Sequence, residues 1–317
     1  MNRTQQILAG VLIAQIALAV FMLWPQPAKA AGEPLLGGLT ADQIVSFTVS
    51  DTSGNSATLE KDGEAWVLAD SDGFPADSET INTLMADVVQ ISTGRTVTKT
   101  AESHARLQVA EDDYLRRVVL VDAEGKEYTL YVGSSIGTSS THVRLEGSNE
   151  VLLTDKVTGY DFGSEPRNWI EATYVTVDRA KMTGMTLQNA NGTFKFTNEG
   201  TAEEENWVMA DLAEGEVFNP NNMISMLTRL GNLQIKKPLG KTELPEYGME
   251  KPSAVVTLDY LDESGAAQQL VVTVGAFDEA DESYYVKAST SDYYVKISSY
   301  TMTDFAERSK VDFLPAE

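Results

Sequence analysis

One pattern of residues occurs twice in this chain, and this repeat constrains the fold more than any other feature of the sequence. The stretch Ala-Trp-Val-Leu-Ala-Asp around Trp66 recurs as Asn-Trp-Val-Met-Ala-Asp around Trp207, about 140 residues later. A duplicated residue in a duplicated strand usually preserves packing, so both tryptophans are expected in a core. The repeat predicts two tandem homologous domains, over residues 39–171 and 177–315.

Each copy is long enough to bury a core of its own, because the chain has 317 residues and an ordinary domain has about 100–200. The period is also far longer than the ~20–50 residues of stacked-repeat solenoids. Within each copy, alternating apolar residues predict strands joined by hairpins, and one helix follows the tryptophan strand. This order predicts an α+β fold in which each domain is an antiparallel sheet of hairpins and meanders with one main amphipathic helix.

Apolar spacing and capping residues give the expected bounds of these elements. In both copies the residues after the tryptophan have the spacing of one helix face. These residues are Ile81, Leu84, Met85, Val88 and Ile91 in one copy, and Met223, Met226, Leu227, Leu230 and Leu233 in the other. The first helix is expected over 77–91, with Asp77 or Ser78 as its N-cap. Residues 40–43, Thr-Ala-Asp-Gln, have the form of a capping box before the first strand. The expected strands are 44–50, 56–61, 64–69, 115–122, 127–132, 141–145, 150–154, 255–261, 269–274, 284–288 and 293–297.

An apolar run near the N-terminus predicts that the rest of the chain is exported. Residues 7–24 are apolar except for Gln15, and as a helix they would rise about 27 Å, close to the ~30 Å of a bilayer core. The run is longer than the ~7–15 apolar residues typical of a signal peptide, so a retained single-pass anchor over residues 1–31 is favoured. The alternative is a signal peptide cleaved near Ala30 and Ala31, which would leave a secreted or periplasmic protein.

Charge and cysteine content narrow the class of protein further. The sequence has 47 acidic and 24 basic residues, and all the acidic ones lie beyond residue 31. Such a surface repels nucleic acid, so no nucleic-acid partner is expected. The sequence has no cysteine, which excludes an N-terminal lipid anchor on cysteine. It also excludes the class of small secreted modules that disulfides stabilise. A protein of the bacterial cell envelope is the simplest interpretation.

The second copy carries a loop with a distinctive motif. Residues 243–252 read Glu-Leu-Pro-Glu-Tyr-Gly-Met-Glu-Lys-Pro, so that Tyr247, Gly248 and Pro252 form the pattern Tyr-Gly-x-x-x-Pro. Together with the tryptophan strand, the helix and a final Tyr-Val-Lys hairpin, this order resembles the bacterial family of domains of unknown function numbered 4340 (DUF4340). The first copy departs from the motif, with Leu-Gln-Val-Ala-Glu-Asp at 107–112.

The resemblance implies a membrane-tethered envelope protein of a kind often encoded beside ABC-type transporters related to the gliding-motility system. It therefore implies an accessory role in a transport assembly of the bacterial cell membrane, with both repeats extracytoplasmic. An ABC-type transporter permease or another envelope protein is the implied partner. The resemblance transfers no catalytic residues and no cofactor.

Aromatic residues of the second copy form a candidate interaction surface. They bracket a predicted hairpin, so their rings should appear on both faces of the ribbon. Exposed tyrosines there could dock a protein or a glycan, whereas packing across the hairpin is the ordinary role of tyrosine in a strand. With the loop motif, the candidate residues are Tyr247, Gly248, Pro252, Tyr284, Tyr285, Tyr293 and Tyr294.

Residues for catalysis or metal binding form no recognised pattern in the sequence. The two histidines, His104 and His142, lack the spacing of metal ligands and are expected at the surface. The pattern Gly-x-Ser-x-Gly occurs at residues 133–137, but it lies between two expected strands, 127–132 and 141–145, and not between a strand and a helix, so it is not a nucleophile elbow. The sequence has no phosphate-binding loop, and a pair such as Asp112 and Asp113 is expected by chance among 47 acidic residues. We expect a non-enzymatic protein without cofactor or metal. The alternatives are a secreted envelope module that binds a glycan or a cation, and an unrecognised hydrolase.

Overall fold

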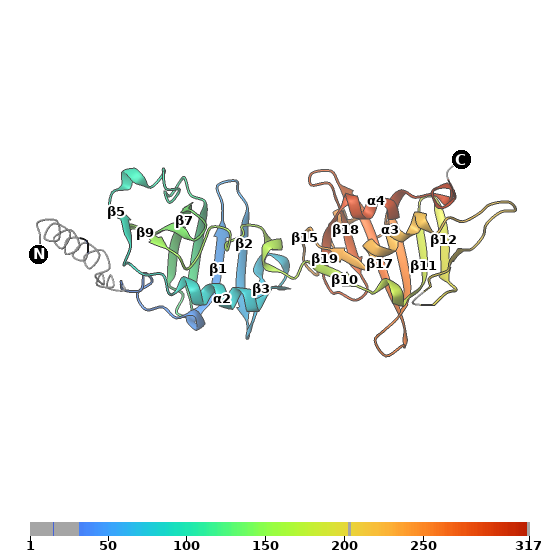
Figure 1. Cartoon of the computed structure of the whole chain (residues 1–317), viewed down its shortest axis with the longest axis horizontal. Coiled ribbons are helices and arrows are strands. Elements are labelled where there is room, and N and C mark those ends of the chain that lie inside the picture. Colours follow the sequence, from blue (N-terminus) through green and yellow to red (C-terminus); the bar gives the residue numbers. More distant parts are fainter. Residues whose placement is uncertain (1–14, 16–31, 202–203, 316–317) are drawn as a thin grey trace, which may run out of the picture.

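The computed structural model describes residues 15, 32–201 and 204–315. Two large antiparallel sheets follow one another along the long axis of the molecule, and helices lie across a face of each sheet (Figure 1). The architecture is α+β, as the sequence predicts.

The first sheet contains nine strands in the order β4-β3-β2-β1-β6-β7-β8-β9-β5. Their bounds are β1 Ile44–Ser50, β2 Ser56–Asp62, β3 Ala65–Leu68, β4 Phe74–Pro75, β5 Thr96–Thr98, β6 Arg116–Asp122, β7 Glu127–Ile136, β8 Ser140–Leu145 and β9 Val151–Thr154. Helix α2 (Ser78–Val88) covers this sheet. The 3-10 turns are η1 Ala41–Gln43, η2 Ala69–Ser71, η3 Ala101–Ser103 and η4 Pro166–Trp169.

The second sheet contains eight strands in the order β13-β12-β11-β16-β17-β18-β19-β15. Their bounds are β11 Met182–Asn189, β12 Gly192–Asn198, β13 Trp207–Met209, β15 Lys237–Pro238, β16 Ala254–Leu261, β17 Ala267–Asp278, β18 Ser283–Ala288 and β19 Tyr294–Ser298. A separate two-stranded sheet pairs β10 (Thr173–Thr176) with β14 (Asn232–Gln234). The remaining elements are the helices α3 Asn221–Leu230 and α4 Ser299–Glu307 and the 3-10 turns η5 Arg179–Lys181, η6 Pro245–Tyr247 and η7 Lys310–Phe313.

Apart from β4, the two large sheets have the same strand order, with β1 in the place of β11 and β6 to β9 in the places of β16 to β19. Their irregularities coincide as well. The register shifts between Ile44 and Ser46 where β1 meets β6, and between Met182 and Gly184 where β11 meets β16. A second shift follows Val132 in β7 and Val274 in β17. Each shift adds residues to one strand and bends the sheet locally, so the two sheets bend at equivalent places.

The predicted tryptophans lie in the core. Trp66 is 1% exposed and Trp207 is 3% exposed. The Trp66 ring meets Phe47 edge-on, with ring centroids 5.3 Å apart, and the same Phe47 ring meets Trp169 at 5.1 Å. The buried indole N–H of Trp66 donates to Asn82 Oδ1 on helix α2 at 2.8 Å, which satisfies a polar group that burial would otherwise leave unpaired. Trp66 therefore fixes helix α2 on the sheet by both packing and a hydrogen bond.

Local capping signals also correspond to the structure. The backbone N–H of Thr40 donates to Gln43 Oε1 at 2.9 Å, which confirms the predicted capping box. Asp77 is the N-cap of helix α2, and its carboxylate accepts from the backbone N–H of Thr80 at 3.1 Å. The helix ends at Val88 rather than at the predicted residue 91.

The predicted strands are present with ends shifted by a few residues, but the sequence did not indicate helix α4. This helix begins directly after β19 and buries Met302, Phe305 and Ala306. The second half therefore has two helices, α3 and α4, instead of one. Because α4 buries only three side chains in nine residues, its apolar face is too short to show a clear helical period.

Among the residues that the structure describes, no helix has both the length and the apolar character needed to cross a membrane. The predicted anchor at 7–24 lies outside these residues, with the exception of Gln15.

The two halves contact each other through the loop between η2 and β4 and through residues near β15 and β19. The Tyr293 hydroxyl donates to the backbone oxygen of Gly73 at 2.6 Å, and its ring lies 4.7 Å from the ring of Phe74. The backbone N–H of Lys241 donates to Asp72 Oδ2 at 2.9 Å. These contacts join the first sheet to the second, so the halves share one continuous apolar core.

Candidate functional site

The Tyr-Gly-x-x-x-Pro motif forms a tight turn beside the second sheet. Pro245 begins the 3-10 turn η6, and Gly248 ends it in the left-handed conformation, with φ of 67°. A side chain at Gly248 would also meet the Cβ of Ala276 at 2.9 Å. Glycine is therefore required here both by the backbone angle and by the available space.

The turn is pressed against strand β17 at a second glycine. A Cβ at Gly275 would lie 2.0 Å from the backbone oxygen of Tyr247. The first half has the same arrangement, since a Cβ at Gly133 in β7 would lie 2.2 Å from the backbone oxygen of Leu107. In both halves, the absence of a side chain on a strand glycine lets the backbone of the loop before the strand pack directly on the strand.

Three of the candidate tyrosines come together under this turn. The rings of Tyr247 and Tyr285 are stacked, with centroids 4.7 Å apart and planes 23° apart. The ring of Tyr294 lies 5.4 Å from that of Tyr247. The Tyr294 hydroxyl donates to Glu243 Oε2 at 2.8 Å, and burial together with Glu243 raises the pKa of Tyr294 to about 12. Tyr294 is therefore a neutral hydrogen-bond donor that holds the start of the loop.

An ion cluster around the buried Lys296 lies next to the tyrosines, since Lys296 Nζ is 4.9 Å from the centroid of the Tyr285 ring. Lys296 is 7% exposed and forms ion pairs with Asp278 and with Asp281, the latter at 3.1 Å. Burial alone would lower the pKa of Lys296, but the two carboxylates raise it above its ordinary value. The hydrogen bond from Lys296 in turn holds the pKa of Asp278 at about 2. The Tyr285 hydroxyl donates to Asp278 Oδ2 at 3.2 Å, so the cluster and the stacked rings form one network.

The outer side of the turn is open to solvent. Leu244 is 40% exposed, Glu246 and Glu250 are exposed, and Pro252 is half-buried. A hollow of about 490 Å³ lies against residues 243–245 and 248–251. The site therefore has a base of packed tyrosines and ion pairs, and an exposed rim with the apolar Leu244, the acidic Glu246 and Glu250, and the basic Lys251.

The remaining candidate tyrosines lie elsewhere. Tyr284 is 5% exposed and packs in the core, 5.1 Å from Phe277. Tyr293 lies at the contact between the two halves. The rings of the hairpin thus occupy both faces of the ribbon, but Tyr247, Tyr284 and Tyr294 are each less than a tenth exposed. These three tyrosines therefore pack beneath the protein surface and expose little area to a partner.

One family matches the chain, under the description "Domain of unknown function (DUF4340)", over residues 66–237. The chain belongs to the DUF4340 family. Neither the curated proteins nor the solved structures contain a match to it.

The stretch matched by DUF4340 begins at Trp66 in the first sheet and ends at Lys237 in β15 of the second. It includes helices α2 and α3 and all of the chain between them. The motif of Tyr247, Gly248 and Pro252, one of the features that carry the resemblance, lies beyond this stretch, whereas both tryptophans and the helices α2 and α3 lie within it. Membership of the DUF4340 family therefore depends on the middle of the chain and not on the loop.

Both histidines lie within the DUF4340 stretch, and the expectation that they are surface residues is wrong. His104 is 8% exposed and His142 is 4% exposed. His142 Nδ1 lies 2.6 Å from the backbone oxygen of Ser134, and His104 Nε2 lies 3.1 Å from the backbone oxygen of Asn149. These contacts join each histidine to a residue of another segment, and the residues next to the histidines in the sequence do not show them. Within the described residues, no three acidic or histidine side chains are grouped closely enough to hold a metal ion.

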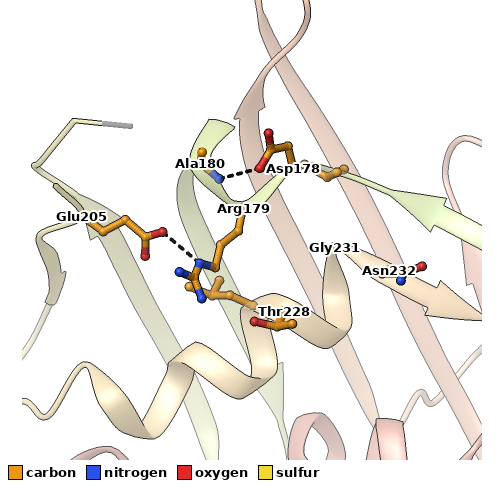
Figure 2. A pocket seen from close by; sticks show the side chains of 9 residues that line it. Asp178, Arg179, Ala180, Glu205, Thr228, Gly231 and Asn232 are labelled. Carbon is orange, nitrogen blue, oxygen red and sulfur yellow. Dashed lines mark hydrogen bonds and ion pairs between the residues drawn. The ribbon is translucent and has the colours of Figure 1, made fainter. Parts of the chain in front are cut away.

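A second hollow, which sequence reasoning missed, lies between turn η5 and helix α3 (Figure 2). Its volume is about 650 Å³. Arg179 and Glu205 line it and form an ion pair, with Nε 2.8 Å from Oε1. Asp178 accepts from the backbone N–H of Ala180 at 3.0 Å, and the Thr228 hydroxyl donates to the backbone oxygen of Ile224 at 3.0 Å. The ion pair and these hydrogen bonds fix the side chains that line the hollow.

Proposed function

We propose that this chain is a non-enzymatic, membrane-anchored extracytoplasmic protein that binds other proteins of the bacterial cell envelope. The role that fits best is an accessory component of an ABC-type transport assembly of the gliding-motility kind. The apolar run at 7–24 supports the anchor, and the excess of acidic residues beyond it supports an exported, soluble remainder. Membership of the DUF4340 family is consistent with this role.

We further propose that the chain beyond the anchor consists of two tandem homologous domains, at 39–171 and 177–315. The shared strand order supports this, as do the coincident register shifts. The paired glycines Gly133 and Gly275 add an independent argument, because each makes room for a loop oxygen at the same strand end. Duplication followed by divergence explains a shared scaffold whose loops carry different residues.

The observation that carries the proposal is the stack of Tyr247 on Tyr285 beneath an exposed turn. Most surface loops lose conformational freedom when a partner binds, and that loss weakens binding. Here the tyrosine stack, Gly248 and the Glu243 hydrogen bond already fix the turn. A pre-ordered turn with an exposed Leu244 and acidic neighbours is suited to docking a folded protein.

Crosslinking in native membranes, followed by identification of the attached proteins, tests this function. We expect a transporter permease or another envelope protein to be recovered with the chain. Recovery of the uncrosslinked chain alone would contradict the proposal. Fractionation of the same membranes tests the anchor, because a fully soluble protein that begins at Ala31 would show that the leader is cleaved.

A further inference from the structure

A basic pocket lies between the two halves of the molecule. It has a volume of about 460 Å³ and is lined by the β1–β2 turn at 54–56, by residues 164–167 around turn η4, by Lys236 and Lys237, and by Asp281. The turn and η4 belong to the first half, because Trp169 of η4 packs on Phe47. Lys237 is in β15 and pairs with Lys296 in β19 of the second half. A ligand in this pocket would touch both halves.

Three of the lining residues are cationic, although the whole chain has a net charge of −23. They are Arg167, Lys236 and Lys237. Lys236 donates to the backbone oxygen of Asp281. Within the described part of the chain, the side chains of Arg167 and Lys237 have no ion pair, and both residues are exposed to solvent. Two free cations from different halves therefore converge on one hollow.

Two carboxylates, those of Glu165 and Asp281, also line the pocket. Glu165 is the exposed N-cap of η4, and its backbone N–H donates to Asn168 Oδ1 at 3.1 Å. Asp281 forms an ion pair with Lys296, at 3.1 Å. The nearby Asp51 accepts from the Ser164 hydroxyl at 2.7 Å and from the Asn55 amide at 3.0 Å. Of the two lining carboxylates, Asp281 has its charge offset by an ion pair, and the three lining cations outnumber the two carboxylates.

We infer that this pocket binds a small phosphate-bearing anion, held by Arg167 and Lys237 and therefore shared between the two halves. A planar guanidinium binds a phosphate through two parallel hydrogen bonds, and an ammonium adds a point charge. The surrounding acidic surface repels anions in general, so occupancy requires the specific contacts that the pocket supplies. A bound anion would hold the two halves in the relative orientation that the Tyr293 contact also favours.

Calorimetric titration of sodium phosphate into the full-length protein in detergent at pH 7 tests this inference, with sodium chloride of equal ionic strength as the blank. We expect saturable binding of phosphate that the double variant R167Q/K237Q weakens by about tenfold or more, because each charge-assisted contact is lost. The single variants R167Q and K237Q should each show part of this loss. Both residues are exposed, so the variants should melt like the wild type.

The matched control is R106Q/K195Q, which removes the same two charges from exposed residues outside the pocket. It should bind phosphate as the wild type does. An equal loss in this control would show that only the net charge matters and would overturn the inference, as would wild-type binding no tighter than that of R167Q/K237Q. Vesicles that contain phosphatidylglycerol supply a lipid-borne phosphate. Binding to these vesicles without binding to inorganic phosphate would also overturn it.

Discussion

The backbone oxygen of Tyr247 lies where Gly275 lacks a side chain, so that a Cβ on Gly275 would approach it to 2.0 Å. The close approach of this oxygen to Gly275 determines how near the Tyr-Gly turn lies to the sheet. It also places the ring of Tyr247 for its stack on Tyr285. The glycine in the strand and the tyrosine in the loop are therefore parts of one arrangement.

Replacement of Gly275 by alanine should destabilise the protein by about 3 kcal/mol, at the upper end for overpacking, because the obstructing atom belongs to the backbone. The measurement is the free energy of unfolding in urea. The control is Gly184→Ala, where the new Cβ would lie 3.3 Å from the movable carboxylate of Asp259. This variant should stay within about 1 kcal/mol of the wild type. Equal effects of the two substitutions would refute the proposed contact.

The stack of Tyr247 on Tyr285 should appear as a coupling energy. A double-mutant cycle with Tyr247→Leu and Tyr285→Leu should give about 0.5–1.5 kcal/mol, the usual value for an aromatic pair beyond its buried area. Unfolding in urea measures all four proteins of the cycle. Strictly additive effects would show that the two rings do not support each other.

The stability that Asp278 contributes should depend on pH. Its folded-state pKa is about 2, held there first by the hydrogen bond from Lys296, and an unfolded aspartate has a pKa of about 3.9. A depressed folded-state pKa stabilises the protein above pH 4, and this contribution is lost as the pH falls from about 4 to about 2. The stability difference between the wild type and Asp278→Asn should therefore be constant near pH 7 and shrink below pH 4. A difference that does not change with pH would contradict this account.

Tyr293 should control how strongly the two halves unfold together. Tyr293→Phe removes the hydrogen bond to Gly73, which should cost about 0.5–1.5 kcal/mol, while the ring can still pack on Phe74. Calorimetric melting should show a broader transition for this variant, since the halves are less coupled. Tyr300→Phe is the control, because Tyr300 is 82% exposed, and its melting should match that of the wild type.

Much of the scaffold could be predicted from the sequence, because the signals involved are local and periodic. The alternation in β1 and β16, the apolar face of α2 and the capping box at Thr40 each depend on neighbouring residues. The two tryptophans could be placed in the core because they recur at equivalent positions of the repeat. Helix α4 could not be predicted, since its apolar face is short.

The site was predictable only in part. The motif and the hairpin tyrosines were recognisable, but the stack of Tyr247 on Tyr285 joins residues of two separate elements, and no local pattern shows which rings meet. His104 and His142 likewise contact residues of other segments, Asn149 and Ser134, which no local pattern indicates. The basic pocket was not predictable, because Arg167 and Lys237 approach each other only through the packing of the two halves.

The central claim is that the turn above Tyr247 docks a protein of the envelope. The most direct test places a photoreactive amino acid at Leu244 in the full-length protein and irradiates native membranes. The control places the same photoreactive amino acid at Val217, another exposed apolar residue, which is 64% exposed. We predict that Leu244 crosslinks to a transporter component or another envelope protein and that Val217 does not. No adduct from Leu244, or the same adducts from both positions, would contradict the claim.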